Sequence, residues 1–268
     1  MTPRLGRADV HVHTLASDGT SSIAEILAFA EERTDLDVIA ITDHERIDAG
    51  IAAQAMAGDL GLRVRVVVGE EITTRGGHLL GLFLRERVPA LRPLRWSIEA
   101  IHDQGGIAIP AHPFVPLWIC AQGFMLRRLL DGPAAARPDA IETFNPTAVG
   151  RYGHAKSAAF AEARALARVG SSDAHVATAI GSGYTSFPGH HPEDLRRAIL
   201  ERTTRAHGEF HGTAGQLGTF GRQLRKYGRD ARDELAGRVR RDGTGRDHGY
   251  PGGRSRPPRF DPAPGDRA

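Results

Sequence analysis

Short apolar runs recur along the first 188 residues, and nearly every run ends in one or two side chains that can bind a metal ion. Between them lie segments with apolar residues at helical spacing, an alternation that favours βα units and a parallel sheet, closed or open. Strands are expected over 8–13, 37–42, 63–69, 78–84, 106–112, 139–145 and 168–175, and helices over 23–33, 47–56, 95–104 and 154–167. The carboxyl ends of barrel strands form one face, so residues that follow different strands meet there. The sequence therefore predicts a site assembled by the fold.

The side chains at the run ends are imidazoles and carboxylates. They are His11 and His13, Asp43 and His44, Glu70 and Glu71, His112, Glu142, and Asp173 with His175. Alternate residues of a strand share a face, so Asp9, His11 and His13 are expected on the same face of the first strand. His78 opens its run, and it reaches the site only if its strand runs opposite to the others or lies at the rim. The set offers more ligands than one tetrahedral ion can use, which predicts two or three ions such as Zn, Mn, Fe or Mg.

A cluster of two ions suits the hydrolysis of phosphate esters. Two ions that share a carboxylate ionise a bridging water near neutral pH and stabilise the charge that builds on a transferring phosphoryl group. The sequence has neither the G-x-S-x-G nor the G-x-x-x-x-G-K-[ST] motif. Metal hydrolases that cut amide bonds also begin with His-x-His, and many bridge their metals through a carboxylated lysine. The only lysines here are Lys156 and Lys226, one in an expected helix and one in a basic tail, which weakens that alternative.

The ordered motifs "DVHVHTLASDGT", "AITDHE", "GEEIT", "GHLLGLF", "IPAHP" and "SSDAH" resemble those of the PHP (polymerase and histidinol phosphatase) superfamily over about residues 7–188. The resemblance implies an α/β fold, a distorted (β/α)7 TIM-like barrel with the metal site at the carboxyl ends of the strands. It implies up to three ions: one at His11, His13, Glu71 and Asp173, a second at Glu71, His78 and His112, and a third at Asp18, His44 and His175. The short interval between "HLLG" and "AHP" indicates a short member of the superfamily.

Two positions carry alternatives within that resemblance. Glu71 is chosen over Glu70 as the bridging carboxylate, because it is the third residue of a G-x-E-[IV]-[ST] stretch and neighbouring strand residues face opposite ways. Asp18 in "SDG" is a predicted ligand, but it could instead form a turn or cap the helix that begins near residue 21 or 22.

Five further residues are expected around the ligands. Asp9 and Asp43 are predicted to orient ligating imidazoles. Arg75 is a candidate for substrate binding, because a guanidinium near the metals clamps a phosphate in bidentate fashion. Asn145 and Arg151 follow a strand end and could bind a phosphate or sugar, with an ordinary loop position as the alternative.

The net charge of +3 is unevenly distributed. From residue 209 onward there are 13 Lys or Arg against 8 Asp or Glu, whereas residues 1–208 hold 22 against 24. We expect a PHP-type β/α barrel over 1–208, a basic amphipathic helical extension over 209–240, and a disordered Gly/Pro/Arg-rich tail over 241–268. The basic region could contact nucleic acid, and a helix packed on the barrel is the alternative.

Cysteine usage and hydropathy favour a cytoplasmic protein. The single cysteine, Cys120, excludes an intrachain disulfide and a thiolate metal site. No apolar stretch is long enough to span a bilayer, and the N-terminus lacks the apolar centre of a signal peptide.

The predicted function is a metal-dependent phosphoesterase with two to three divalent ions, Mn, Zn or Fe, as cofactors. A metal-bridging hydroxide held by Glu71 and Asp173 would attack the phosphorus of a mono- or diester. A nucleotide, a short oligonucleotide or a small metabolite phosphate are the substrates considered. Two alternatives stay open: an amide or lactone metallohydrolase, and a nucleic-acid-associated module in which the basic tail binds.

Overall fold

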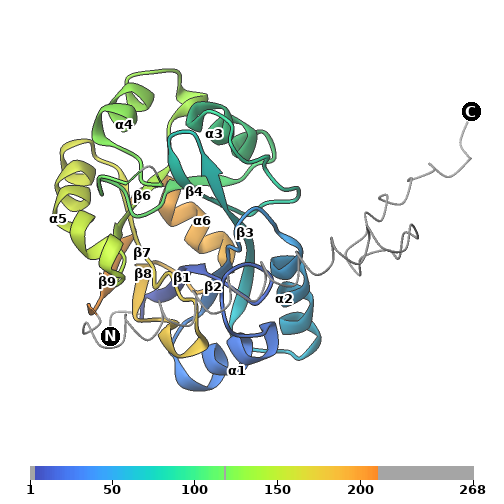
Figure 1. Cartoon of the computed structure of the whole chain (residues 1–268). Helices are drawn as coiled ribbons and strands as arrows, with labels where there is room; N and C mark the ends of the chain where they lie inside the picture. Colours follow the sequence, from blue (N-terminus) through green and yellow to red (C-terminus); the bar gives the residue numbers. More distant parts are fainter. Residues whose placement is uncertain (1–3, 118, 211–268) are drawn as a thin grey trace, which may run out of the picture. The chain divides into compact units, whose positions relative to one another are not determined.

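A computed structural model describes residues 4–117 and 119–210 of the chain, in which strands and helices alternate (Figure 1). The strands are β1 (Gly6–Val12), β2 (Val38–Ile41), β3 (Arg65–Thr74), β4 (Gly77–Leu82), β5 (Ile107–Pro110), β6 (Ala140–Phe144), β7 (Ala167–Gly170), β8 (Gly183–Phe187) and β9 (Arg205–Gly208). The helices are α1 (Ile23–Arg33), α2 (Asp48–Asp59), α3 (Leu94–Asp103), α4 (Gly123–Leu130), α5 (Ala148–Ala163) and α6 (Pro192–Leu200), with two 3₁₀ turns at Ala134–Ala136 and Ala177–Ala179.

The strands form a curled sheet of seven and a separate pair. The seven-stranded sheet has the order β5-β4-β3-β2-β1-β8-β9, and β6 pairs with β7 in parallel. β1, β2 and β3 are also parallel, whereas β4, β5, β8 and β9 each join their neighbours antiparallel. The α/β class is confirmed. The complete (β/α)7 barrel is not, because the antiparallel strands interrupt the βα repeat and β6–β7 has no ladder to the larger sheet.

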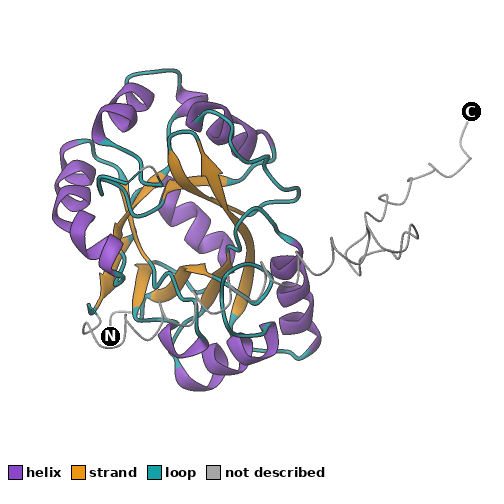
Figure 2. Cartoon of the chain, in the orientation of Figure 1, coloured by secondary structure: helices purple, strands orange, loops and turns teal. Residues whose placement is uncertain are grey.

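Isolated hydrogen bonds hold the pair β6–β7 between the two ends of the curled sheet. Next to β5, the backbone N–H of Asp139 donates to the carbonyl of Ala108 at 3.0 Å. Next to β8, the backbone N–H of Gly170 donates to Thr185 Oγ1 at 3.0 Å. The strands therefore surround a common interior, with most helices outside them (Figure 2).

Helix α6 closes the interior at the amino end of the strands. Leu195, Ala198 and Ile199 of α6 are buried in one apolar cluster with residues from most of the strands, including Ala8 and Val10. Figure 1 shows α6 through the ring of strands. Because this end is filled with apolar side chains, the polar residues of the strands gather at the opposite, carboxyl end.

Helix boundaries follow local capping. α1 begins after Ser22, whose hydroxyl accepts from the backbone N–H of Glu25 while the Glu25 carboxylate accepts from the N–H of Ser22. α5 begins at Ala148, six residues before the predicted start, because the Thr147 side chain caps it by accepting from the N–H of Gly150. The predicted helix over 154–167 also ran too far, since Ala167 belongs to β7.

In the part of the chain that the structure describes, every helix is too short or too polar to cross a membrane. The predicted extension over 209–240 and the predicted tail over 241–268 lie outside the described residues, except for the first two positions.

Candidate metal centre

An irregularity in the pairing of β1 brings His11 and His13 to the carboxyl end of the sheet. Its pairing register with β2 shifts between Asp9 and Val12. Val10 therefore packs in the interior cluster with α6, whereas Val12 packs in the cluster that includes α1 and α2. This bulge interrupts the simple alternation, so Asp9 does not join His11 and His13 as the sequence pattern predicted.

The segment after β7 pairs with the carboxyl end of β1, where His11 and His13 lie. Val12 and Ala174 form an isolated parallel bridge, in which the N–H of His13 donates to the Ala174 carbonyl at 2.9 Å. The residues on either side of Val12 and of Ala174 thus point the same way. These four residues are His11, His13, Asp173 and His175.

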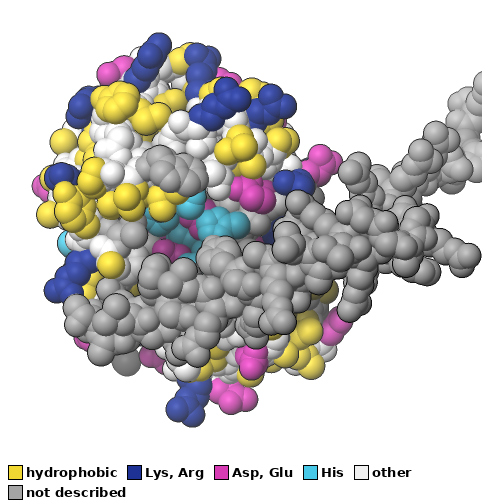
Figure 3. All heavy atoms as spheres, viewed as in Figure 1, with side chains coloured by type: hydrophobic (Ala, Val, Ile, Leu, Met, Phe, Trp, Pro, Cys, Tyr) yellow, Lys and Arg dark blue, Asp and Glu magenta, His cyan; other side chains and the backbone are white. Residues whose placement is uncertain are grey.

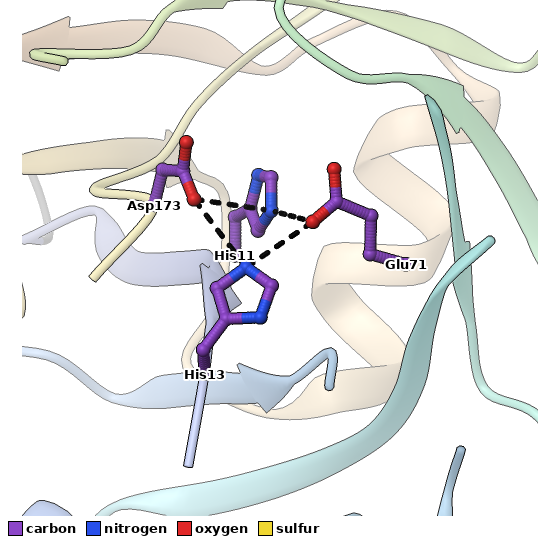
Figure 4. A group of neighbouring side chains, drawn as sticks. All are labelled: His11, His13, Glu71 and Asp173. Carbon is purple, nitrogen blue, oxygen red and sulfur yellow. Dashed lines mark hydrogen bonds and ion pairs between the residues drawn. The ribbon is translucent and has the colours of Figure 1, made fainter. Parts of the chain in front are cut away.

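Glu71 on β3 stands between two groups of imidazoles. Its Oε2 lies 3.0 Å from His11 Nε2, 3.2 Å from His13 Nε2 and 3.4 Å from His44 Nε2. Its Oε1 lies 2.7 Å from His78 Nδ1 and 3.2 Å from His112 Nε2. One carboxylate therefore presents a different oxygen to each group, which is the arrangement of a bridging ligand. Figure 4 shows Glu71 with His11, His13 and Asp173 around one point.

His78 reaches this group because β4 runs antiparallel to β3. Thr74 pairs with Gly77 across a two-residue turn, so His78 lies near the carboxyl end of β3 although it opens its own strand. The sequence placed His78 at the site only if its strand ran opposite to the others or lay at the rim, and β4 does run opposite to β3.

A third group forms around Asp18, which is 8% exposed. Asp18 Oδ2 lies 2.9 Å from His175 Nε2 and 3.7 Å from His44 Nε2, and Oδ1 lies 3.4 Å from His13 Nδ1. Ser22 caps α1, so Asp18 is not needed there. The structure thus brings all nine predicted ligands together, and their role as metal ligands is taken up below as a proposal.

The imidazoles and carboxylates of the cluster perturb one another's proton affinities. Burial lowers the pKa of His11, but Asp173 and Glu71 outweigh it and hold this pKa well above its usual value. Burial acts likewise on His13, whose pKa is raised to about 10 by Asp18 and the other carboxylates. Burial raises the pKa of Glu71, yet the surrounding imidazoles hold it well below its usual range. The cluster is therefore a network of paired charges buried in the protein.

The donor atoms fit divalent metal ions. The ligand atoms of His11, His13, Glu71 and Asp173 all lie within 4.8 Å of one another, as do those of two further groups, His13–Asp18–His175 and His44–Glu71–His78. Both ring nitrogens of His13 are buried without a partner in hydrogen-bond geometry, although carboxylate oxygens lie 3.2 to 3.4 Å away. Nitrogen and oxygen donors aimed at a shared point match Zn, Mn or Fe.

Glu142 on β6 contacts the outer ring nitrogen of His11. It was named as a residue at the end of an apolar run but was not among the predicted site residues. Its Oε1 lies 3.1 Å from His11 Nδ1, and its Oε2 accepts from the backbone N–H of His112 at 2.6 Å. A carboxylate on the outer ring nitrogen fixes the orientation of a ligating imidazole. Its place at the end of an apolar run was the signal that could have identified it.

Asn145 is buried next to Glu142. Its Nδ2 donates to Glu142 Oε2 at 3.1 Å and to Asp173 Oδ2 at 3.2 Å. Asp173 Oδ1 is thereby left facing His11 and His13, at 3.4 and 3.3 Å. These contacts favour a positioning role for Asn145 over the predicted contact with substrate.

The loop after β5 supports the two histidines nearest Glu71 Oε1. The backbone N–H of His78 donates to the Ile119 carbonyl at 2.8 Å, and Cys120 Sγ lies 3.4 Å from His112 Nδ1. His112 itself has a φ of 28°, in the left-handed region that costs a non-glycine residue energy. Nothing in the sequence pattern connected Cys120 with His112, because their proximity depends on how this loop folds back.

Asp9 and Asp43 contact backbone N–H groups and, for Asp43, hydroxyl groups near the ligands rather than imidazole rings. Asp9 accepts from the N–H groups of Ser172 and Gly181, each at 2.9 Å, and so holds the loop that carries Asp173. Asp43 accepts from the backbone N–H and the hydroxyl of Thr14, both at 2.7 Å. The two aspartates thus position ligands through the main chain.

Arg75 and Arg151 are both exposed, and neither side chain contacts the cluster. Arg75 lies in the turn between β3 and β4, and Arg151 stacks over the Phe210 ring with 5.1 Å between the guanidinium carbon and the ring centroid. Their predicted contact with substrate stays a prediction.

A cavity of about 520 Å³ opens beside the cluster at His44. It is lined by Ala16, His44, Glu45, Arg46, Ile47, Asp48 and Arg87. The side chain of His44 is 26% exposed, more than any of its eight companions. Histidine side chains are visible in the hollow at the centre of Figure 3. The cluster is therefore open on one side.

Comparisons with known proteins bear on the fold and the family of this chain. A family model described as PHP-associated matches residues 151–204. A solved two-domain protein of Bacteroides vulgatus, described as containing a predicted PHP-like metal-dependent phosphoesterase, superposes with a TM-score of 0.62 at 19% identity, over 82% of this chain and 70% of that one. This chain belongs to the PHP superfamily.

Two relatives in sequence each match only part of this PHP chain. An uncharacterized protein of Methanocaldococcus jannaschii is 36% identical over 122 residues, which are 41% of this chain and 70% of the relative. A phosphoribosyl 1,2-cyclic phosphate 1,2-diphosphodiesterase of Eggerthella lenta is 35% identical over 92 residues, 32% of this chain and 34% of that protein.

Proposed function

We propose that this PHP chain is a metal-dependent phosphoesterase that hydrolyses phosphate mono- or diesters. The observation that carries the proposal is the position of Glu71, whose two carboxylate oxygens face separate groups of imidazoles. The name of the Eggerthella lenta relative, a cyclic phosphate diphosphodiesterase, supports an ester of phosphoric acid as the substrate.

The nine ligands would hold two or three ions. One set comprises His11, His13, Glu71 and Asp173, a second Glu71, His78 and His112, and a third Asp18, His44 and His175. Ions bound at such a cluster would supply the chemistry of metal-assisted hydrolysis: they would ionise a water near neutral pH and stabilise the charge of a transferring phosphoryl group. Imidazole and carboxylate donors suit Mn, Zn and Fe, which are the ions we propose.

The protein itself contributes fixed geometry. Glu142 and Asn145 hold His11 and Asp173 from behind, so these ligands do not have to reorganise when substrate binds. His44 faces the cavity, so the ester would enter from that side and its leaving group would occupy the space lined by Arg46 and Arg87.

The test is hydrolysis of an aryl phosphate monoester and an aryl phosphate diester by protein supplied with manganese or zinc. Glu71→Gln keeps the size of the side chain but removes the bridging charge, and it is expected to abolish turnover. Glu70→Gln is the matched control, because the neighbouring carboxylate accepts from the Val88 N–H, away from the cluster, at 2.7 Å. Full activity in Glu71→Gln, or equal loss in both variants, would contradict the proposal. Hydrolysis of an aryl amide but not of either ester would favour the amide alternative.

A further inference from the structure

Exposed arginines and aromatic residues lie together beside the metal centre. They belong to the β3–β4 turn, the segment that leads into α3, α3 itself and α4, and none of them is part of the cluster. We call Arg75, Arg92, Trp96, Phe124 and Arg128 the arginine–aromatic rim. Trp96 is 40% exposed and Phe124 66% exposed, although both are large apolar side chains.

Contacts between the β3–β4 turn, α3 and α4 bring the residues of the rim together. The N–H of Arg75 donates to the carbonyl of Arg92 at 2.9 Å, and the Arg92 guanidinium lies over the Trp96 ring at 5.3 Å. A Cβ on Gly76 would lie 2.8 Å from Leu94 Cβ and from Met125 Cε, so α3 and α4 both pack on the turn. Phe124 and Arg128 are four residues apart on α4 and share one face of the helix.

The rim begins where the metal centre ends. Arg75 precedes His78 by three residues across the β3–β4 turn. The segment that leads into α4 supplies the Ile119 carbonyl that holds the His78 backbone. Figure 3 shows Lys or Arg and hydrophobic side chains over the region of α3 and α4, above the hollow that contains the histidines.

The rim arginines lack acidic partners. Within residues 4–117 and 119–210, none of Arg75, Arg92 and Arg128 forms an ion pair or a side-chain hydrogen bond. Arg95, on the same helix as Trp96, is different, because it pairs with Glu99 at 3.0 Å. Three positive charges are therefore available to an anionic ligand, and two aromatic side chains are partly exposed among them, one of which carries the Arg92 guanidinium over one side of its ring.

We propose that the arginine–aromatic rim binds single-stranded nucleic acid. Repeated phosphates match guanidinium groups spaced along a surface, and unstacked bases match exposed aromatic rings. A duplex would bury its bases and leave Trp96 and Phe124 without a role. The inference rests on the proposed function in one respect: the ester hydrolysed at the metal centre would be part of the nucleic-acid strand that the rim binds.

The experiment measures the affinity of the full chain for a fluorescent twelve-nucleotide single strand, by anisotropy at several salt concentrations. All proteins carry Glu71→Gln so that the probe is not degraded. The test variant is Arg75→Ala/Arg92→Ala/Arg128→Ala. The matched control is Arg33→Ala/Arg65→Ala/Arg205→Ala, which removes the same charge near the amino ends of the strands. Trp96→Ala removes one stacking face, and Trp96→Phe retains an aromatic ring.

The rim variant is expected to lose at least tenfold in affinity, and its slope of log K against log salt should flatten by about 2, since each neutralised phosphate of a single strand contributes about 0.7. Trp96→Ala should weaken binding about fivefold or more, and Trp96→Phe should restore most of it. Equal losses in rim and control variants, or unchanged affinity in the rim variant, would overturn the inference. Preference for a duplex of the same length would also overturn it. If the protein with native Glu71 hydrolyses no ester, the proposed function fails, but the rim is judged by these affinities alone.

Discussion

The two ends of the curled sheet are built from the same strands but have opposite chemistry. At the amino end, α6 fills the interior with Leu195 and Ile199, both fully buried among aliphatic residues. At the carboxyl end, the same interior holds imidazoles and carboxylates, and His11 is as deeply buried as Leu195. Burying charges is unfavourable unless they are paired or bind metals. The amino end therefore contributes stability, and the carboxyl end holds the residues of the proposed chemistry.

The largest expected effect is on turnover at the carboxyl end. His13→Ala removes the imidazole that contacts Asp18, Glu71 and Asp173. Ester hydrolysis should fall by at least about 10²–10³-fold, the loss typical of removing one electrostatic stabiliser. Circular dichroism should still show a folded protein with a cooperative transition. If His13→Ala lost its folded structure together with its activity, the assignment of stability to the amino end and chemistry to the carboxyl end would be contradicted.

The converse change at the amino end should affect stability instead. Leu195→Ala empties space between α6 and the strands and is expected to lower the free energy of unfolding by about 2–5 kcal/mol, measured by urea denaturation. Turnover per folded molecule should not change. Leu200→Ala, on the same helix but 54% exposed, serves as the control and should shift stability by less than about 0.5 kcal/mol. If Leu195→Ala were fully folded under the assay conditions but had a much lower turnover, the two ends would be coupled.

A smaller effect is expected behind the metal centre. Cys120→Ala removes the sulfur that lies 3.4 Å from His112 Nδ1. Affinity for one ion should fall about tenfold, in the range typical for residues that orient a ligand, while the other ions bind as before. Competition with a fluorescent chelator measures this, and the unfolding temperature of the metal-free protein is the control. Unchanged affinity would mean that His112 is held by its backbone alone.

The smallest effect concerns a polar contact near the amino end of β5 and β6. The hydrogen bond to Asp139, at 2.9 Å, raises the pKa of His102 against a smaller opposing effect of burial. A raised folded pKa stabilises the protein below the unfolded value of 6.5, and this contribution is lost as pH rises through the folded pKa. Because the pair is partly exposed, we expect less than about 1 kcal/mol. His102→Gln should flatten the dependence of unfolding free energy on pH in this window, and an unaltered pH profile would contradict the assignment.

The ligand positions were predictable because they follow apolar runs. His44, His112 and Asp173 each lie just after a strand, as the run ends indicated. The helix over 23–33 was also predicted with its observed bounds, since Ser22 and Glu25 form a capping box that sequence alone displays.

Other features depend on contacts between distant segments, which periodicity does not encode. The bulge in β1 separates Asp9 from the histidines, although the alternating pattern placed them together. The antiparallel direction of β8 and the packing of one face of α6 against the amino end of the strands follow from tertiary contacts rather than from residue spacing. Cys120 reaches His112 only through the fold of its loop.

The central claim is that Glu71 bridges metal ions at the carboxyl end of the sheet. Mass spectrometry of metal content, on gently purified protein and on Glu71→Gln prepared in parallel, tests it most directly. We expect two or three divalent ions per chain in the protein and at least one fewer in Glu71→Gln, with the metal content of Glu70→Gln unchanged. No bound metal in the protein, or the same content in Glu71→Gln, would contradict it.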